Sequence, residues 1–529
     1  MRVLSSVRRE APSLSEWGAA ATTTFLLIFS FPSYEIFFLA WIALVPLLLV
    51  ITVCPSPLKA FILGWATGSV FFYGTCYWLT YSMIHYGGLP TVLAYLLLIP
   101  GAVVVGIFHG FFASLLALVI RRWGYLALLF APIFWPAFEW LRLGLTGQLW
   151  NALGYSQAFH PSLIMAAKWG GVYAVSFLIV MTNSAIALLV VRRNKTTVIA
   201  AIAMIFFVWC LIPLSEHHPL SQRGSTPRLD IPPLFVIAVQ PNVPMTLIKT
   251  PAELEELRQR HFALSTKALN TIGADYDKLT IWPESPMNFT YASDKTLQDL
   301  LAGFSKDNHT SLLLNSLEPA PKDGSYNSAL LINQDGRLIS QYDKIRLMPF
   351  GEYVPLPQWL PGASLISGLV GEFTPGTEYR LMPVSSRGSR AGVFICIESA
   401  YPWIARTMTN EGAEFLINIS NDGYLGPTAV MRQHLANVIF RAVENDRPIV
   451  RVTNSGLSAL INPNGVVMDQ TKPFETDVRV WTVTPEAETV TTYTTYGDLF
   501  VQICVAITVI VLLVSILENL RWKLYRFRN

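Results

Sequence analysis

The chain has 529 residues, of which 52% are apolar and only 14% are charged, whereas about 25% of the residues of an ordinary soluble domain are charged. Together with a mean hydropathy of +0.42, this composition excludes a disordered chain and a wholly soluble one. The net charge of +3 is too small a bias to indicate nucleic-acid binding. The sequence therefore predicts a membrane protein.

The acidic residues divide the chain into parts. Only five of the 35 acids precede residue 220, and the first aspartate is Asp230, so 30 acids lie in a later segment of soluble composition. We therefore predict a transmembrane bundle over residues 1–219 and a globular domain over 220–492. Residues 493–529 are predicted to form a last membrane helix with a basic tail.

Eight apolar runs are long enough to cross about 30 Å of hydrocarbon as helices. They cover residues 17–32, 35–53, 58–81, 89–120, 124–141, 165–191, 196–214 and 498–517. Because more spans follow the first run, we do not predict it to be a cleaved signal peptide. Lysine and arginine concentrate in alternate loops and at both ends of the chain, with Arg142 as the exception. Since such residues mark cytoplasmic loops, both termini are predicted to be cytoplasmic and the 220–492 domain to lie outside.

The segment Leu143–Pro161 is too polar to span a membrane, yet it contains Trp150 and Tyr155. One interpretation is an interfacial loop on the outer face, and the other is an ordinary aromatic belt. The sequence leaves both open.

The 220–492 domain alternates β-rich runs with helical ones. Helices are predicted at Ala252–Leu269, Ser399–Gly412 and Thr428–Glu444. Strands are predicted at Leu234–Val239, Leu279–Trp282, Ser311–Leu314, Ser328–Asn333, Ser340–Tyr342, Gly392–Ile397, Phe415–Ile419, Ile449–Thr453, Ser458–Ile461 and Val478–Val483. This alternation is typical of a layered α/β sandwich.

Cys396 is the only cysteine in this domain, because the other four lie in or beside apolar runs. In an oxidising compartment, an unpaired thiol is either a buried small hydrophobe or a reactive group. An apolar run ends at Cys396 and a predicted helix follows, and a helix N-terminus favours a thiolate.

Two more chemically active residues lie at predicted strand ends, namely Glu284 and Lys344. A carboxylate can accept the proton of a thiol, and a lysine can stabilise both the thiolate and the oxyanion formed next. Either residue alone would more often be a solvated or paired charge. The hypothesis therefore depends on all three strand ends meeting.

The order of several motifs resembles the nitrilase, or carbon–nitrogen hydrolase, superfamily. The motifs are Trp282–Glu284, Tyr342–Lys344, Cys396–Glu398, Gly351–Pro355 and Asn418–Gly423. With the predicted spans around the domain, the chain resembles the bacterial apolipoprotein N-acyltransferases over nearly its whole length. Further matches are Trp140–Arg142, Gly154–Gln157, Val239–Asn242, Gln433–His434 and Arg441–Pro448.

The resemblance implies an α-β-β-α sandwich domain and a catalytic triad of Glu284, Lys344 and Cys396. It implies transfer of a fatty acyl chain from a phospholipid, through a thioester on the cysteine, to the N-terminal amine of a diacylglyceryl-cysteine lipoprotein. Neither a metal nor a cofactor is expected. The expected setting is the bacterial inner membrane, with the catalytic domain on the periplasmic side and the protein acting as a monomer.

Several accessory residues follow from the same resemblance. Glu352 is expected either to act directly in the site or to form an ion pair with Lys344 or Arg346. Glu398 and Asn421 are weaker candidates for the pocket wall, since either could instead satisfy buried backbone groups. Two positions depart from the family pattern, because Lys249 replaces a tryptophan and Ile397 replaces a tyrosine.

The stretch Tyr353–Gly371 contains no charge but several large apolar residues, among them Trp359 and Leu360. We predict a lid that dips into the outer leaflet and contributes these two side chains to substrate binding. The alternative is a loop that packs on its own domain.

Three other functions fit parts of the sequence. A membrane-anchored amidase or lipid hydrolase would use the same triad with water as acceptor, although a single anchor would suffice for it. A transporter or receptor is disfavoured because the spans hold few ionisable groups. Cys–His catalysis through His434 lacks a supporting third residue.

Overall fold

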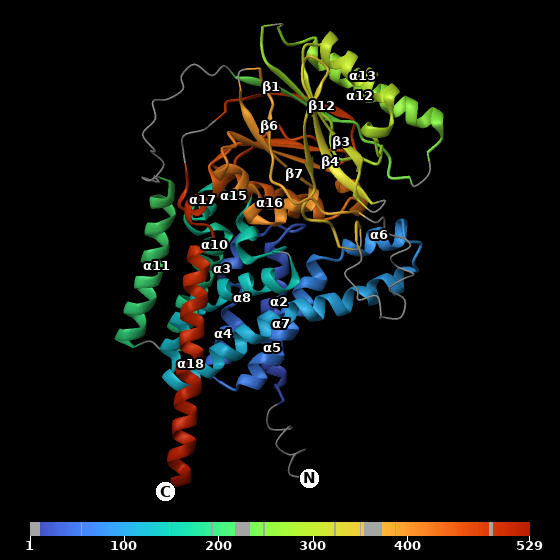
Figure 1. Cartoon of the computed structure of the whole chain (residues 1–529). Helices are drawn as coiled ribbons and strands as arrows, with labels where there is room; N and C mark the ends of the chain where they lie inside the picture. The colour runs from blue at the N-terminus through green and yellow to red at the C-terminus, as the bar shows by residue number, and fades with distance from the viewer. Residues whose placement is uncertain are drawn as a thin grey trace. The chain divides into compact units, whose positions relative to one another are not determined.

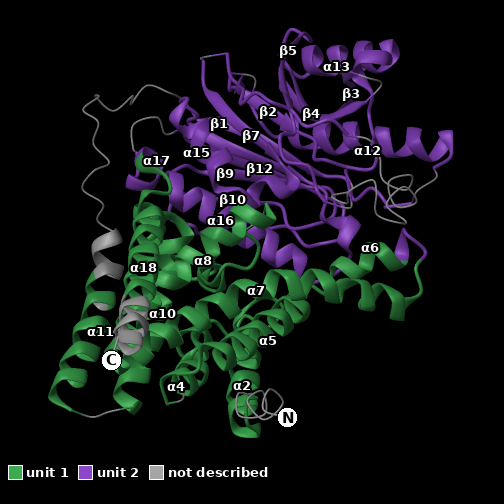
Figure 2. Cartoon of the chain, turned by 60° about the horizontal axis from the view of Figure 1, so that its bottom comes forward, with its two compact units in different colours: residues 1–84, 89–218, 496–529 green, residues 85–88, 219–495 purple. Residues whose placement is uncertain are grey.

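Figure 1 shows the computed structural model of the chain. It describes residues 11–528 except 54, 148, 192–193, 217–232, 247–248, 274, 322–323, 350, 354–372, 387 and 486–489. The chain forms two compact units, coloured separately in Figure 2. Unit 1 comprises Met1–Ile84, Leu89–His218 and Tyr496–Asn529, and unit 2 comprises His85–Gly88 and Pro219–Thr495.

Unit 1 is built from helices. They are α2 (Leu14–Ser30), α3 (Ala40–Ala43), α4 (Val45–Val53), α5 (Pro57–Thr75), α6 (Leu79–His85), α7 (Thr91–Trp123), α8 (Ala131–Thr146), α9 (Pro161–Ile164), α10 (Ala167–Val191), α11 (Lys195–Glu216) and α18 (Leu499–Arg528). Helices α5 and α7 pack so closely that a Cβ atom at Gly106 would overlap with Ser69. Small residues permit this approach between apolar helices.

Four helical segments of the described chain are long and apolar enough to cross a membrane. They are Thr91–Trp123, Tyr125–Thr146, Ala167–Val191 and Leu499–Leu517. The other four predicted runs form α2, α4, α5 and α11, which do not meet the same requirement among the described residues. The structure thus confirms several apolar helices but not the number eight.

Residues 149–158 of the segment Leu143–Pro161 pack inside unit 1, whereas Gly144, Leu145 and Gly147 are exposed. Its short 3₁₀ helix Leu153–Gln157 is entirely buried, as is Trp150. The Gln157 side chain accepts a hydrogen bond from Trp41 at 3.1 Å and donates one to the Phe37 carbonyl at 3.0 Å. These contacts join it to an earlier part of the same unit.

Unit 2 contains two six-stranded sheets. The first has the order β12-β1-β2-β3-β4-β5 and the second β11-β10-β9-β8-β7-β6. Strands β1, β2 and β3 are parallel, as are β7, β8 and β9. The strands are β1 (Leu234–Gln240), β2 (Lys278–Ile281), β3 (Ser311–Pro319), β4 (Ser325–Ile332), β5 (Leu338–Asp343), β6 (Leu381–Pro383), β7 (Arg390–Ile395), β8 (Phe415–Ser420), β9 (Ile449–Thr453), β10 (Ala459–Ile461), β11 (Val467–Met468) and β12 (Asp477–Val483).

Helices cover both sheets. Helices α12 (Pro251–Leu269) and α13 (Lys295–Asp307) pack on the first sheet, and α15 (Pro402–Asn410) and α16 (Val430–Asn445) on the second, while β1 contacts β9 between the sheets (Figure 1). Apolar side chains of the first sheet and its helices, such as Trp282 and Leu301, form one buried cluster. A final short helix, α17 (Thr492–Tyr496), follows β12. The predicted layered α/β sandwich is therefore confirmed.

Some predicted elements differ from the structure. The helix predicted from Ser399 begins only at Pro402, because Cys396–Ala400 form a 3₁₀ helix first. Helix α13 and the short strands β6 and β11 were not predicted from the sequence. Helix α13 nevertheless carries a start signal, since the Asp294 side chain accepts a hydrogen bond from the Leu297 N–H.

Candidate active site

Three strand ends of unit 2 supply the predicted triad. Glu284 follows β2 and Lys344 follows β5, both in the first sheet. Cys396 follows β7 in the second sheet and begins the 3₁₀ helix. The triad thus draws on both sheets of the sandwich.

Lys344 lies buried between two carboxylates. Its Nζ atom is 2.8 Å from Glu352 Oε1 and 3.4 Å from Glu284 Oε1, and its side chain is only 1% exposed. Burial alone would lower the pKa of this amine, but the negative charges of Glu284 and Glu352 outweigh it and raise the pKa well above its usual value. Lys344 is therefore a fixed positive charge.

Asn327, on β4, was not predicted as a site residue. Its Nδ2 atom donates to Glu284 Oε1 and to Glu352 Oε1, each at 2.8 Å, and Asn315 donates to its Oδ1 atom at 2.7 Å. The amide thus fixes the positions of both carboxylates relative to each other. A single asparagine in a strand carries no sequence signal for such a role.

Glu352 forms an ion pair with Lys344, one of the two roles predicted for it. Its second oxygen accepts a hydrogen bond from the Met348 N–H at 2.7 Å. The carboxylate is thereby tied to its own turn as well as to Lys344. Trp359 and Leu360, with the rest of 354–372, lie outside the described residues, so the predicted lid stays a prediction.

Cys396 has a backbone φ of +52°, a left-handed conformation that residues other than glycine seldom adopt. Burial raises the pKa of its thiol well above the ordinary value, and the negative charge of Glu284 adds to this effect while Lys344 opposes it. The resting cysteine is therefore a neutral thiol. It needs a base to become a nucleophile.

His434, on α16, supports the backbone of Cys396 rather than its thiol. Its Nε2 atom is 2.9 Å from the Cys396 carbonyl oxygen and its Nδ1 atom 2.8 Å from Asp422 Oδ1. Asp422 also accepts a hydrogen bond from Arg451 at 2.6 Å. Both ring nitrogens of His434 thus have partners other than the thiol, which argues against Cys–His catalysis.

Glu398 braces two turns of the site. It accepts hydrogen bonds from the backbone N–H groups of Ile395 and Ile345, both at 2.7 Å, and of Arg346 at 3.1 Å, as well as from the Tyr342 hydroxyl. Burial raises the pKa of its carboxyl to about 7. Glu398 therefore satisfies buried backbone groups, the second of its two predicted roles.

Asn421 contacts the triad through its backbone. Its N–H donates to Glu284 Oε2 at 3.1 Å, while its side chain reaches Met245 Sδ at 3.2 Å. Of the two positions that depart from the family pattern, Ile397 is buried, and Lys249 Nζ donates to the Thr246 carbonyl at 2.8 Å.

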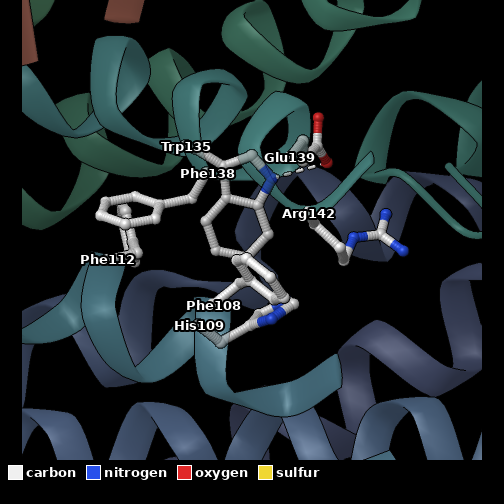
Figure 3. A pocket seen from close by; sticks show the side chains of 7 residues that line it. All are labelled: Phe108, His109, Phe112, Trp135, Phe138, Glu139 and Arg142. Carbon is white, nitrogen blue, oxygen red and sulfur yellow. Dashed lines mark hydrogen bonds between the residues drawn. The ribbon is translucent and has the colours of Figure 1, made fainter. Parts of the chain in front are cut away.

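Unit 1 contains a separate small cavity, shown in Figure 3. It is lined by Phe108, His109, Phe112, Trp135, Phe138, Glu139 and Arg142. Glu139 accepts hydrogen bonds from the Trp135 indole at 2.9 Å and from the Leu153 N–H at 2.7 Å, and Arg142 donates to the Trp150 carbonyl at 2.7 Å. These polar side chains therefore brace unit 1.

Two family models and several named relatives match this chain. Residues 23–185 match the model of the apolipoprotein N-acyltransferase N-terminal domain, and residues 237–493 match that of the carbon–nitrogen hydrolases. An apolipoprotein N-acyltransferase of Geobacter metallireducens is 32% identical, covering 91% of each chain, and one of Shewanella oneidensis is 29% identical, covering 76% of this chain and 77% of its own. A solved Saccharomyces cerevisiae member of branch 10 of the nitrilase superfamily is 19% identical with a TM-score of 0.38, covering 50% of this chain and 94% of its own.

The family models match most of the chain, and the Geobacter relative matches it nearly from end to end. The chain therefore belongs to the apolipoprotein N-acyltransferase family.

Proposed function

We propose that this protein transfers a fatty acyl chain from a phospholipid to the free amine of a diacylglyceryl-cysteine at the N-terminus of a lipoprotein. Glu284, Lys344 and Cys396 would be its catalytic residues. The observation that carries the proposal is the buried ammonium group of Lys344, which lies between Glu284 and Glu352 at the end of β5. The charges of Glu284 and Lys344 also act on the pKa of the Cys396 thiol, in opposite directions. Such a site can generate a thiolate and stabilise an oxyanion.

In the first half-reaction, Glu284 takes the proton of the Cys396 thiol, and the sulfur attacks the ester carbonyl of the phospholipid. The developing oxyanion is stabilised by the ammonium group of Lys344. The ester C–O bond then breaks, and the leaving alkoxide takes the proton back from Glu284. A thioester on Cys396 and a lysophospholipid result.

In the second half-reaction, the acceptor amine attacks the thioester carbonyl. Glu284 accepts a proton from the amine and returns it to the departing sulfur, so the amide forms and the thiol is restored. Glu352 holds Lys344 in place through both steps, and Asn327 holds Glu284, because Asn327 donates to Glu284 and to Glu352 while Glu352 accepts from Lys344. The chemistry follows a ping-pong order.

Apolar helices and family membership support a membrane setting. We propose eight spans, with domains at 1–219, 220–492 and 493–529. In this arrangement both termini are cytoplasmic, the catalytic domain is periplasmic at the inner membrane, and the enzyme is a monomer. The stretch Tyr353–Gly371, with Trp359 and Leu360, would act as the lid that admits lipid.

The test separates transfer from hydrolysis. Purified protein loaded with phospholipid should keep its acyl group for many turnover times without an acceptor, because an apolar site excludes water. A diacylglyceryl-cysteine peptide with a free amine should discharge it to the N-acyl peptide, and the N-acetylated peptide should not. Rapid release of free fatty acid at the same rate with both peptides would instead establish the lipid-hydrolase or amidase alternative.

A further inference from the structure

Arg346 lies beside the proposed triad and takes no part in it. It follows Lys344 by two residues, and its backbone N–H donates to Glu398 Oε1 at 3.1 Å. Glu398 in turn follows Cys396 by two residues and accepts a hydrogen bond from Ile395, next to the nucleophile. The backbone of Arg346 is thus tied to the turn that carries the cysteine.

The guanidinium of Arg346 is held by aromatic rings. Its Cζ atom lies 5.2 Å from the centre of the Trp403 ring and 5.7 Å from that of Tyr401. These two rings contact each other edge to face, and they follow directly after the 3₁₀ helix that Cys396 begins. Arg346 therefore touches the segment after the nucleophile at two points, through its backbone and through its side chain.

The charge of Arg346 is not neutralised by the described part of the protein. Its side chain is exposed, and it forms no hydrogen bond or ion pair with any residue that the structure describes. Arg380, by contrast, pairs with Glu378 at 2.7 Å, and Arg451 pairs with Asp422 at 2.6 Å. A guanidinium that stacks on rings keeps the N–H donors in its plane free for an anion.

We propose that Arg346 binds the phosphodiester group of the acyl-donor phospholipid. The inference rests on the proposed function, in which the ester of that lipid reaches Cys396. The ester and the phosphate are attached to one glycerol, so a phosphate must lie close to the thiol whenever the ester does. The planar fork of N–H groups matches two phosphate oxygens, and its contacts with the Trp403 and Tyr401 rings fix it in advance, which lowers the entropy cost of binding.

The test compares two acyl donors with identical chains, phosphatidylethanolamine and diacylglycerol, which has the ester but no phosphate. The rate of thioester formation is measured by intact mass on the full-length protein in detergent. Arg346→Gln should raise KM for the phospholipid roughly 10- to 100-fold, the range expected for losing hydrogen bonds to a charged group. Its kcat with phospholipid and its kinetics with diacylglycerol should stay as in the wild type.

Two further variants make the result specific. Arg346→Lys keeps the positive charge but lacks the planar guanidinium, so its KM for the phospholipid should lie between those of the wild type and of Arg346→Gln. Arg380→Gln is the matched control, because this arginine is also exposed but already paired with Glu378. It should leave the kinetics with both donors unchanged. An unchanged phospholipid KM in Arg346→Gln, or an equal loss with both donors, would overturn the phosphate assignment. Acylation through Cys396 would stand in either case, since wild type and Cys396→Ala test it separately.

Discussion

Replacing His434 by leucine tests whether a buried network positions the nucleophile. The change removes the hydrogen bonds to the Cys396 carbonyl and to Asp422 Oδ1. Asp422 keeps Arg451 at 2.6 Å and Ser420 at 3.0 Å as partners, so its charge stays compensated. The Cys396 carbonyl loses one partner, at a cost of about 1–3 kcal/mol.

That loss acts on a backbone that is already strained. The left-handed conformation of Cys396, with φ of +52°, costs on the order of 1–3 kcal/mol and persists only while its surroundings enforce it. Without His434, Cys396 can relax and move its sulfur away from Glu284 and Lys344. A displacement of about 1 Å typically costs 100-fold in rate, and we expect this loss in acyl-enzyme formation at saturating phospholipid.

The assay is the rate of mass gain after mixing with phospholipid, with thermal unfolding measured alongside. His434→Gln keeps a side-chain amide that can donate to the carbonyl and should recover most of the rate. His261→Leu is the control, because His261 is equally buried in α12 and bonds the carbonyl of Leu257 in its own helix. The positioning role of His434 is refuted if His434→Leu forms the thioester at the wild-type rate, or if His434→Gln forms it as slowly as His434→Leu.

The remaining predictions concern the cation site, pH and topology. Asn327→Leu should slow acylation at least about 10-fold, because two carboxylates each lose a charge-assisted hydrogen bond; wild-type acylation rates would contradict this. Since burial raises the pKa of Glu398 to about 7, its contribution to stability is full below about pH 4.5 and is lost as pH rises through 7. Denaturant unfolding should show this decline in the wild type but not in Glu398→Gln, and an equal decline in both would exclude Glu398 as its source. A reporter active only in the cytoplasm should work when fused after Lys195 and fail after Pro241, and the reverse result would place the catalytic domain in the cytoplasm.

The sequence predicted the layers of unit 2 because its strands and helices have distinct apolar periods. It also predicted Glu284, Lys344 and Cys396 as candidates, because each follows a strand and the three motifs occur in the family order. The supporting partners could not be predicted in the same way. Asn327 reaches two glutamates from a neighbouring strand, and His434 reaches Cys396 from a helix 38 positions away in the sequence. Such contacts depend on sheet order and helix placement, which no local pattern encodes.

The number of membrane spans was harder to predict from the sequence than the layers of unit 2. Apolar composition identified eight runs, of which four form described helices long and apolar enough to cross a membrane, and the other four remain predicted spans. Hydropathy reports which residues avoid water, and in unit 1 many of these residues are buried against each other. Within the segment Leu143–Pro161, residues 149–158 are buried in unit 1, where Gln157 finds hydrogen-bond partners, whereas Gly144, Leu145 and Gly147 are exposed.

The most direct test of the account is the intact mass of the full-length protein after incubation with phospholipid of defined chains. The wild type should gain the mass of one fatty acyl group, located on Cys396 by peptide mapping and removed by hydroxylamine. Cys396→Ser should fold and insert but gain no acyl group, because serine lacks the easily formed thiolate and His434 is held away from this side chain. An adduct that persists in Cys396→Ala, or that maps to another residue, would contradict the proposed mechanism.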